Sequence, residues 1–195
     1  MRIVAGKFRR RRLLTNPGLQ TRPLTDRVKE TLFEHLEDEL KNKRVADVFS
    51  GTGTIGFEAL SRGAASVVFI ETDRRALELL KRNVETLKVE DQTLCWRADV
   101  LRTSYRPKGV PHLVPFDVVF FDPPYKMVAD LKPETPFFKS VERLAREGVT
   151  SPGAWLVFRT PADATFQLPD SWRPVHTFEF ATMHIHLFRK ADAPA

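Results

Sequence analysis

Hydrophobic and polar residues form two patterns that alternate along this chain. Short apolar runs bounded by turn residues are typical of buried strands. Such strands are expected at residues 44–49, 66–70, 94–98, 116–121 and 154–159. Between them, apolar residues recur every three or four positions, which is typical of amphipathic helices. These helices are expected at residues 25–40, 55–62, 74–87 and 135–147.

Strands that alternate with helices predict an α/β fold with right-handed crossovers and ligands at the carboxyl ends of parallel strands. Residues 172–180 and 183–189 follow without a helix between them and predict a closing antiparallel pair. The expected fold is therefore a mostly parallel seven-stranded sheet with helices on both faces and an antiparallel C-terminal strand. The 195 residues fit one domain, with a basic extension at residues 1–24 and a core at residues 25–195.

A glycine-rich loop follows the first strand, at residues 47–56. Its glycines let the backbone turn tightly and approach a ligand, and the following helix offers free N–H groups. Glu71 lies twenty residues beyond Gly51, where a carboxylate would hold the ribose of a nucleotide. This pattern fits a dinucleotide-dependent dehydrogenase and an S-adenosylmethionine-dependent enzyme equally well.

Acidic residues near the ends of neighbouring strands favour the second of these enzymes. Asp47 comes just before the glycines, where it would repel a pyrophosphate but attract an ammonium group, directly or through water. Asp99 follows the third strand and can accept a hydrogen bond from an adenine amino group. The chain has nothing that resembles a hydride-transfer His or Tyr–Lys pair. S-adenosylmethionine, with its amine, ribose and adenine, therefore fits better than a nicotinamide.

The fourth strand ends in Phe121-Asp122-Pro123-Pro124-Tyr125. We expect the two prolines to prevent a helix from starting there and the tyrosine ring to be exposed. Asp122 and the carbonyl of Pro123 can accept the two hydrogens of an exocyclic amine, while Tyr125 stacks on the ring that carries it. The motif suggests a site for a planar, amine-bearing ring; the alternative is an ordinary proline-rich turn after a core strand.

The net charge of +6 is concentrated at the amino terminus. Residues 1–12 contain six basic side chains and no acid. Such a segment is an electrostatic footprint for nucleic acid, because each phosphate that it neutralises releases counterions. The alternative is a solvated charge run or a disordered tail. Apolar residues on both sides of the arginines, and turn residues at Gly6 and at 16–18, favour a small basic β-hairpin.

Several other classes of protein do not fit the sequence. No apolar run approaches the roughly 20 residues that span a membrane, and no signal peptide is expected. The single Cys95 excludes an intramolecular disulfide and a cysteine zinc cluster. We therefore expect a cytoplasmic protein, a monomer that needs neither a metal ion nor a membrane.

Five segments carry a resemblance to a known family. They are residues 1–8, 21–33, 47–56, 58–64 and 122–125. The chain resembles the class I S-adenosylmethionine-dependent methyltransferases, which have a Rossmann-like fold. It is most similar to the RsmD-like family of bacterial enzymes, which methylate a guanine N2 of 16S ribosomal RNA in the small subunit. The glycine loop is generic to methyltransferases and the proline motif to amino methylation, so the amino-terminal block points to this family.

The resemblance implies a role for three sets of residues. S-adenosylmethionine is expected against Asp47, Phe49, Ser50, Gly51, Thr52, Gly53, Glu71, Thr72, Asp99 and Val100. The reaction centre is expected at Asp122, Pro123, Pro124 and Tyr125. Ribosomal RNA, free or in the small subunit, is expected at Lys7, Arg9, Arg10, Arg11, Arg12, Arg22 and Arg27. The chain departs from the family at residues 180–183, where a Tyr-Gly-Asp-Thr-like stretch is usual.

Two alternatives stay open from the residues alone. An N6-adenine methyltransferase acting on DNA or RNA would use the same proline motif. A non-catalytic RNA-binding or assembly protein that keeps some cofactor affinity is the second alternative, although an intact motif at residues 122–125 argues against it. The choice of guanine rests on the resemblance.

Overall fold

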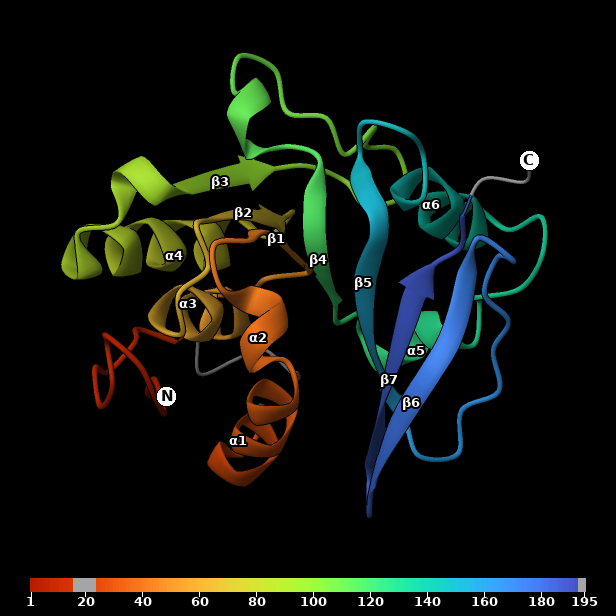
Figure 1. Cartoon of the computed structure of the whole chain (residues 1–195), viewed down its shortest axis with the longest axis horizontal. Coiled ribbons are helices and arrows are strands. Elements are labelled where there is room, and N and C mark those ends of the chain that lie inside the picture. The colour runs from red at the N-terminus through yellow and green to blue at the C-terminus, as the bar shows by residue number, and fades with distance from the viewer. Residues whose placement is uncertain (16–23, 193–195) are drawn as a thin grey trace.

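The computed structural model describes residues 1–15 and 24–192 and has a seven-stranded sheet in the order β3-β2-β1-β4-β5-β7-β6 (Figure 1). The strands are β1 (Arg44–Val48), β2 (Ser66–Glu71), β3 (Thr93–Arg97), β4 (Phe116–Phe121), β5 (Thr150–Pro161), β6 (Trp172–Phe180) and β7 (Met183–Lys190). β1 to β5 are parallel, and β7 lies antiparallel between β5 and β6. The predicted mostly parallel sheet with an antiparallel C-terminal end is confirmed.

Helices cover both faces of this sheet. They are α1 (Asp26–His35), α2 (Glu37–Leu40), α3 (Thr54–Ser61), α4 (Arg74–Leu87), α5 (Tyr125–Val128), α6 (Pro136–Leu144) and the short 3-10 turns η1 (Glu90–Gln92) and η2 (Pro111–Leu113). Apolar side chains of α1 to α4 form one buried cluster with alternate strand residues, and those of α5, η2 and α6 form the other. Because strand side chains alternate, Phe120 enters the first cluster and Phe121 the second.

The helix predicted over residues 25–40 is broken in two. Thr25 caps α1 as expected, since its hydroxyl accepts a hydrogen bond from the Val28 N–H at 3.3 Å. At Leu36 the backbone leaves the helical region, with φ −97° and ψ 5°, and α2 begins directly afterwards. Leu32 before the break, Leu36 at the break and Leu40 after it are all buried. The apolar spacing therefore continues across the break, and the pattern cannot reveal it.

The expectation that the two prolines prevent a helix from starting is wrong. α5 begins at Tyr125, directly after Pro124, which takes the N-cap position with φ −53° and ψ 132°. A proline is tolerated at the start of a helix, because the N–H groups of the first turn have no partner within the helix. Tyr125 is thereby fixed at the first position of a short helix instead of in an open loop.

Residues 1–15, which we call the N-terminal arm, fold back on themselves and lie against α3 and α4 (Figure 1). An isolated antiparallel bridge joins Arg2 to Arg12. Ile3 and Leu13, one on each leg, are buried in the core beside α1. The turn expected at residues 16–18 lies outside the described residues.

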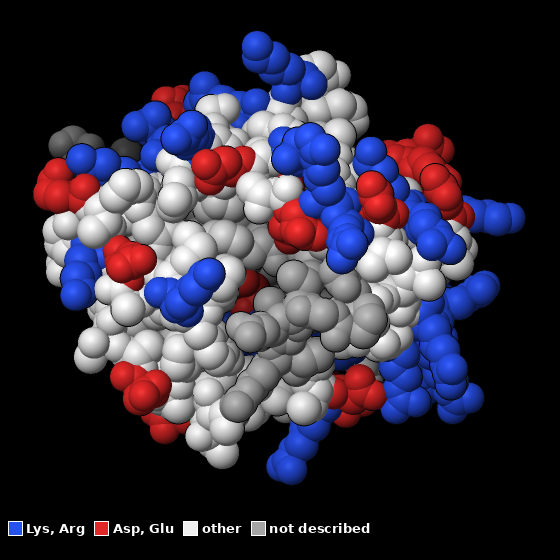
Figure 2. Space-filling model, turned by 180° about the vertical axis from the view of Figure 1, so that it is seen from behind, with Lys and Arg blue, Asp and Glu red and all other residues white. Residues whose placement is uncertain are grey.

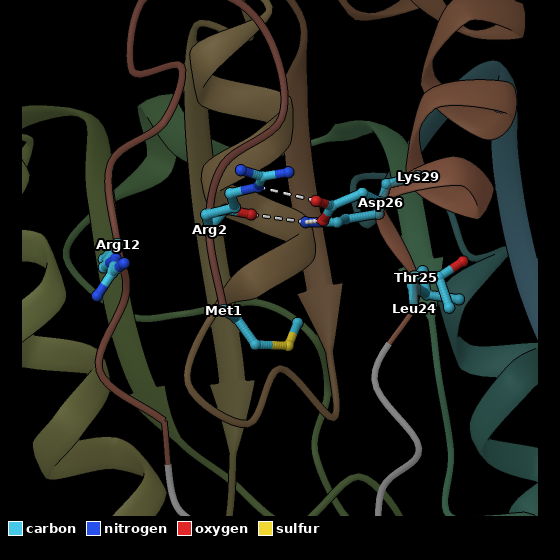
Figure 3. Close-up of a pocket in the computed structure, with 7 residues that line it drawn as sticks. All are labelled: Met1, Arg2, Arg12, Leu24, Thr25, Asp26 and Lys29. Atoms are coloured by element: carbon cyan, nitrogen blue, oxygen red, sulfur yellow. Dashed lines mark hydrogen bonds and ion pairs between the residues drawn. The ribbon is translucent and has the colours of Figure 1, made fainter.

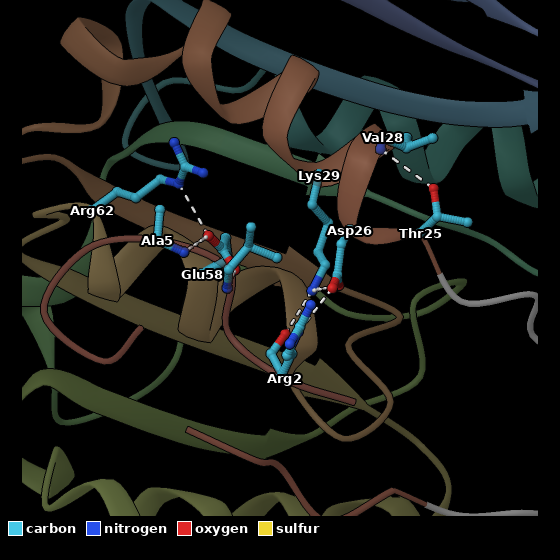
Figure 4. A network of polar contacts seen from close by, with 9 residues as sticks. Arg2, Ala5, Thr25, Asp26, Val28, Lys29, Glu58 and Arg62 are labelled. Atoms are coloured by element: carbon cyan, nitrogen blue, oxygen red, sulfur yellow. Dashed lines mark hydrogen bonds and ion pairs between the residues drawn. The ribbon is translucent and has the colours of Figure 1, made fainter. Parts of the chain in front are cut away.

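Polar contacts hold the arm to two helices (Figure 4). The Glu58 carboxylate, fully buried in α3, accepts hydrogen bonds from the N–H groups of Val4 at 2.8 Å and Ala5 at 3.1 Å. Lys29 of α1, also buried, donates to the Arg2 carbonyl at 2.7 Å. The arm is therefore a docked part of the domain.

Candidate active site

Acidic residues from four neighbouring strands lie along one edge of the sheet. Asp47 belongs to β1, Glu71 ends β2, and Asp99 and Asp122 follow β3 and β4. The strand order β3-β2-β1-β4 places their carboxyl ends side by side, since all four strands are parallel. This edge is where α/β sheets bind ligands.

Asp47 is a buried carboxyl group in which one of the two oxygens has a hydrogen-bond partner among the described residues. Its Oδ2 accepts a hydrogen bond from the Gly56 N–H at 2.8 Å, and only 1% of the residue is exposed. Its Oδ1 is buried and has no hydrogen-bond partner among residues 1–15 and 24–192. Burial raises the pKa of Asp47 to about 8, and the negative charges of Asp122 and Glu71 add to this shift. The site therefore suits a ligand that brings a cation or an N–H donor.

The glycine loop next to Asp47 is bent by left-handed backbone conformations. Phe49, which is not a glycine, has φ 63°, and Gly51 and Gly53 have φ 56° and 85°. A Cβ on Gly53 would approach the Leu80 side chain to 2.5 Å, whereas a Cβ on Gly51 would meet nothing within 4 Å. The loop therefore packs tightly on α4 at Gly53 and leaves open space at Gly51. In the same loop, the Ser50 hydroxyl is buried without a partner in the part of the chain that the structure describes.

Glu71 shapes this loop, a role that the sequence did not suggest. Its Oε2 accepts a hydrogen bond from the Gly51 N–H at 2.8 Å. Its Oε1 accepts from the N–H groups of Thr72 at 2.7 Å and Asp73 at 2.8 Å. A carboxylate has about four acceptor positions. The Thr72 hydroxyl also lies 3.5 Å from the Oε1. These bonds fix the orientation of the carboxylate and leave room at its Oε2 for about one further donor, such as a ribose hydroxyl.

Asp99 and Val100 lie farther along the edge, in the loop after β3. The Asp99 carboxylate is half-exposed, accepts from the Leu101 N–H at 2.9 Å and faces Arg102 at 3.6 Å. Arg143 of α6 holds this loop, donating to the carbonyls of Leu101 at 2.7 Å and Val100 at 3.3 Å. Sequence reasoning did not identify Arg143, because a single basic residue on a helix carries no distinguishing signal.

Asp122 pairs with an arginine that the sequence analysis also missed. The Arg159 Nε lies 2.5 Å from the Asp122 Oδ1, and the two side chains are 7% and 16% exposed. Burial raises the pKa of Asp122, while the Arg159 guanidinium opposes that rise. A signal was present in the sequence: Arg159 is a charged residue within the apolar strand β5, and a charge at such a position needs a partner.

The Tyr125 ring is not exposed as expected. It is partly buried against the core cluster of α1 to α4, and its hydroxyl is buried without a partner within the described ranges. The Arg159 guanidinium carbon lies 5.6 Å from the ring centre. Asp122, Arg159 and Tyr125 therefore form one cluster; of the two prolines, Pro123 is buried and Pro124 half-buried.

The predicted RNA-binding residues that the structure describes are exposed. They are Lys7, Arg9, Arg10, Arg11, Arg12 and Arg27. Arg22 lies outside the described residues. Figure 2 shows basic side chains gathered at its lower right, the side on which the N-terminal arm of Figure 1 lies after the half-turn between the two views. The arm thus presents a basic surface to solvent.

A cavity of about 370 Å³ lies between the arm and the start of α1 (Figure 3). Its lining residues are Met1, Arg2, Arg12, Leu24, Thr25, Asp26 and Lys29. The Arg2 Nε is 2.8 Å from the Asp26 Oδ2 in an exposed ion pair, which lowers the pKa of Asp26. Exposed pairs of this kind contribute little to stability.

No three His, Cys, Asp or Glu side chains in them lie close enough together to hold a metal ion. No helix in residues 1–15 and 24–192 is long and apolar enough to cross a membrane.

Comparison with known proteins identifies the family. The sequence model of the family described as Conserved hypothetical protein 95 matches residues 1–189. A ribosomal RNA small subunit methyltransferase D of Haemophilus influenzae is 36% identical over 180 residues, which cover 88% of this chain and 84% of that protein. A putative methyltransferase of Escherichia coli has a solved structure with a TM-score of 0.81 and 26% identity, covering 99% of both chains.

A second solved structure agrees with the first. A putative methylase of Haemophilus influenzae matches with a TM-score of 0.72 and 30% identity, covering 98% of both chains. The family match spans nearly the whole chain, including the arm, the glycine loop and the proline motif. The chain therefore belongs to the Conserved hypothetical protein 95 family, and it is a methyltransferase.

Proposed function

We propose that this enzyme transfers a methyl group from S-adenosylmethionine to the exocyclic N2 amine of a guanine in small-subunit ribosomal RNA. One observation carries the proposal: two carboxyl groups with little exposure to solvent, Asp47 in β1 and Asp122 directly after the adjacent strand β4, lie at the same edge of the sheet. The first has an acceptor oxygen without a partner among the described residues, as a cationic cofactor needs, and the second belongs to a motif suited to an amine-bearing base. The name of the Haemophilus influenzae relative supports ribosomal RNA as the substrate.

The residues near the glycine loop fit this cofactor. The partnerless oxygen of Asp47 and the hydroxyl of Ser50 can bond its ammonium group, and Glu71 can accept a ribose hydroxyl. The Asp99 carboxylate is half-exposed and its Oδ2 faces the solvent-exposed Arg102 at 3.6 Å, so it can accept a hydrogen bond from the adenine amine. When bound, the cofactor supplies a methyl group already activated on a sulfonium. The protein's task is then to place the acceptor amine, and orientation of this kind contributes about 7–11 kcal/mol to lowering a barrier.

Asp122 would hold the acceptor amine. An exocyclic amine is a poor nucleophile, because its lone pair is conjugated with the ring. Arg159 binds the Oδ1 of Asp122, so the Oδ2 and the Pro123 carbonyl can each accept one amine hydrogen and direct the lone pair towards the methyl carbon. Tyr125 would stack on the flipped base, a contact worth about 1–3 kcal/mol. The proton released from the product amine can leave to water.

The arm would bind the RNA backbone. Its exposed arginines can neutralise several phosphates, and the cavity between Arg2, Arg12 and the start of α1 is open to a backbone segment. Because ribosomal RNA of bacteria is made in the cytoplasm, we expect the enzyme to act there.

Methylation with tritiated S-adenosylmethionine tests the proposal. Three acceptors are compared: naked small-subunit ribosomal RNA, assembled small subunits and duplex DNA, each followed by nucleoside analysis of the label. We expect label in N2-methylguanosine from one or both RNA substrates. Label in N6-methyladenine, or in DNA alone, would contradict the guanine assignment, and no label in any acceptor would favour a non-catalytic role.

A further inference from the structure

Asn83 lies in the middle of α4 and bonds two functional segments at once. The residue is 1% exposed, so its carboxamide is withdrawn from water. Its Oδ1 accepts from the Leu14 N–H at 2.8 Å, and its Nδ2 donates to the Leu14 carbonyl at 3.0 Å. The same Nδ2 donates to the Thr52 carbonyl at 3.0 Å. Both hydrogens of the amide are thereby used, one on each segment.

The two segments belong to different binding surfaces. Leu14 follows the exposed basic run of residues 9–12 in the N-terminal arm. Thr52 stands between Gly51 and Gly53, two residues after Ser50, whose buried hydroxyl has no partner among the described residues. The side chain of Asn83 therefore joins the basic N-terminal arm to the glycine loop, which contains Asp47 and Ser50.

Within residues 1–15 and 24–192, other side chains that bond the arm or the glycine loop reach one of these segments and not both. Glu58 and Ser61 of α3 bond the arm at Val4, Ala5 and Phe8, and neither bonds the glycine loop. Glu71 bonds the loop at Gly51 and has no bond to the arm. Among the hydrogen bonds found between described residues, those of Asn83 are the ones that link loop and arm directly.

We propose that Asn83 is a positioning residue that couples cofactor binding at the glycine loop to RNA binding by the N-terminal arm. This inference rests on the proposed function, since it requires that the loop binds the cofactor and the arm the RNA. A ligand that fixes the Thr52 carbonyl also fixes the amide bonded to it, and with it Leu14. Coupling of this kind is reciprocal, so each ligand raises the affinity for the other by the same factor.

The coupling factor is measured as a ratio of dissociation constants. The affinity for S-adenosylmethionine is determined by calorimetry with and without saturating small-subunit ribosomal RNA. For the wild type we expect the cofactor to bind about 5- to 10-fold more tightly with RNA present, the lower part of the usual range for coupled sites. In Asn83→Asp, which keeps the acceptor for the Leu14 N–H but lacks the donor hydrogens, we expect a ratio close to one.

Ser61→Ala is the matched control variant. Ser61 bonds the arm through the Phe8 N–H at 2.9 Å and the Ala5 carbonyl at 2.5 Å, yet has no bond to the loop. A merely structural role of Asn83 predicts that both variants lose stability and both keep the wild-type ratio. The coupling role predicts that only Asn83→Asp loses the ratio.

A second measurement needs no variant. The Leu14 N–H is bonded to the Asn83 Oδ1, so S-adenosylmethionine alone, without RNA, should slow the hydrogen exchange of this amide in the wild type. An unchanged exchange rate at saturating cofactor, or a wild-type ratio of one with RNA that does bind, overturns the inference and leaves the proposed function intact. A wild type that binds no RNA at all refutes the proposed function and the inference with it.

Discussion

Asp47 in β1 and Asp122 directly after the adjacent strand β4 are both largely withdrawn from solvent, but their surroundings differ in charge. Asp47 has no cation among its hydrogen-bonding or ion-pairing partners in the described residues, and burial raises its pKa to about 8. Asp122 has the Arg159 guanidinium at 2.5 Å, which opposes the rise of its pKa. In the proposed site, the acceptor side around Asp122 thus has a positive charge beside its carboxyl group, while the cofactor side around Asp47 does not.

This difference indicates how the two sides would work. A buried carboxylate without a counter-charge is costly, so the ligand-free protein keeps Asp47 largely protonated near neutral pH. A cationic ligand would ionise it and release the proton. Arg159 opposes the protonation of Asp122, whose ionised form can accept a hydrogen bond from a neutral amine at its Oδ2.

The largest effect is expected from Asp122→Ala. Removing the acceptor should lower methyl transfer by about 100- to 1,000-fold, comparable with the loss of one preorganised hydrogen-bonding group elsewhere in catalysis. It should also lower the free energy of unfolding by about 3–5 kcal/mol, because it breaks the largely buried ion pair between Asp122 and Arg159 by removing one of the two charges. Single-turnover methylation and denaturant unfolding measure the two effects.

Asp122→Asn is the matched variant, since it restores the shape and one acceptor oxygen. It should recover most of the stability and part of the activity. Cofactor affinity should change by no more than a few-fold in either variant. If S-adenosylmethionine no longer binds to a folded Asp122→Ala protein, Asp122 belongs to the cofactor side and the comparison fails.

Asp47→Asn should weaken S-adenosylmethionine binding by about 10- to 100-fold above pH 8, the usual worth of a hydrogen bond to a charged group. Below pH 8 the wild-type carboxyl takes up a proton, so its advantage over the variant should shrink as the pH falls. Calorimetric titrations at several pH values measure the ratio of the dissociation constants of variant and wild type for S-adenosylmethionine. The titration of the cofactor's own amine affects both constants equally and cancels in this ratio. A ratio independent of pH would mean that Asp47 is already ionised in the free protein.

The same pair of proteins should differ in stability with the opposite dependence on pH. Asp47 titrates near 3.8 when unfolded and near 8 when folded, so the folded state binds an additional proton between these values. The wild-type free energy of unfolding, relative to Asp47→Asn, should therefore fall as the pH rises from about 4 to about 8. The fall is at most about 1.4 kcal/mol per pH unit. Parallel stability curves without cofactor would contradict the raised pKa.

Arg159→Met should shift the pH dependence of activity. Without the guanidinium, burial alone acts on Asp122 and its pKa rises further, so the carboxyl is protonated over more of the neutral range. Methyl transfer should fall by about 10-fold at pH 7 and recover as the pH rises. Arg159→Lys keeps a positive charge and should stay close to the wild-type profile. If methyl transfer has the same pH dependence in Arg159→Met and Arg159→Lys, the charge of Arg159 does not control the protonation of Asp122.

Local signals predicted some elements of the fold to the residue. β4 has the predicted bounds Phe116–Phe121, because a continuous apolar run stands between Pro115 and the proline motif. α4 has the predicted bounds Arg74–Leu87, because Asp73 caps its start and Lys88 ends it in a left-handed conformation. The break at Leu36 was missed, since the apolar spacing continues through it.

The candidate site was only partly predictable, for a physical reason. The acids of parallel strands are brought to one edge by the fold class itself, so Asp47, Glu71 and Asp122 could be grouped from the sequence. Arg159 lies 37 residues from Asp122, and their contact depends on the pairing of Phe121 with Phe158 between β4 and β5. A single sequence gives no means of fixing that register.

The smallest effect is expected from Ser50→Ala, which tests the cofactor side without changing a charge. The Ser50 hydroxyl is buried and has no partner in residues 1–15 and 24–192, so removing it should change the free energy of unfolding by less than about 1 kcal/mol. S-adenosylmethionine affinity should fall by about 3- to 10-fold, the net worth of one neutral hydrogen bond. Ser61→Ala should show the reverse, because Ser61 bonds the Ala5 carbonyl and the Phe8 N–H. If the Ser50→Ala protein loses stability but keeps its affinity for S-adenosylmethionine, the Ser50 hydroxyl bonds another group of the protein and not the cofactor. The cofactor side would then resemble the acceptor side, where Arg159 of the protein bonds Asp122.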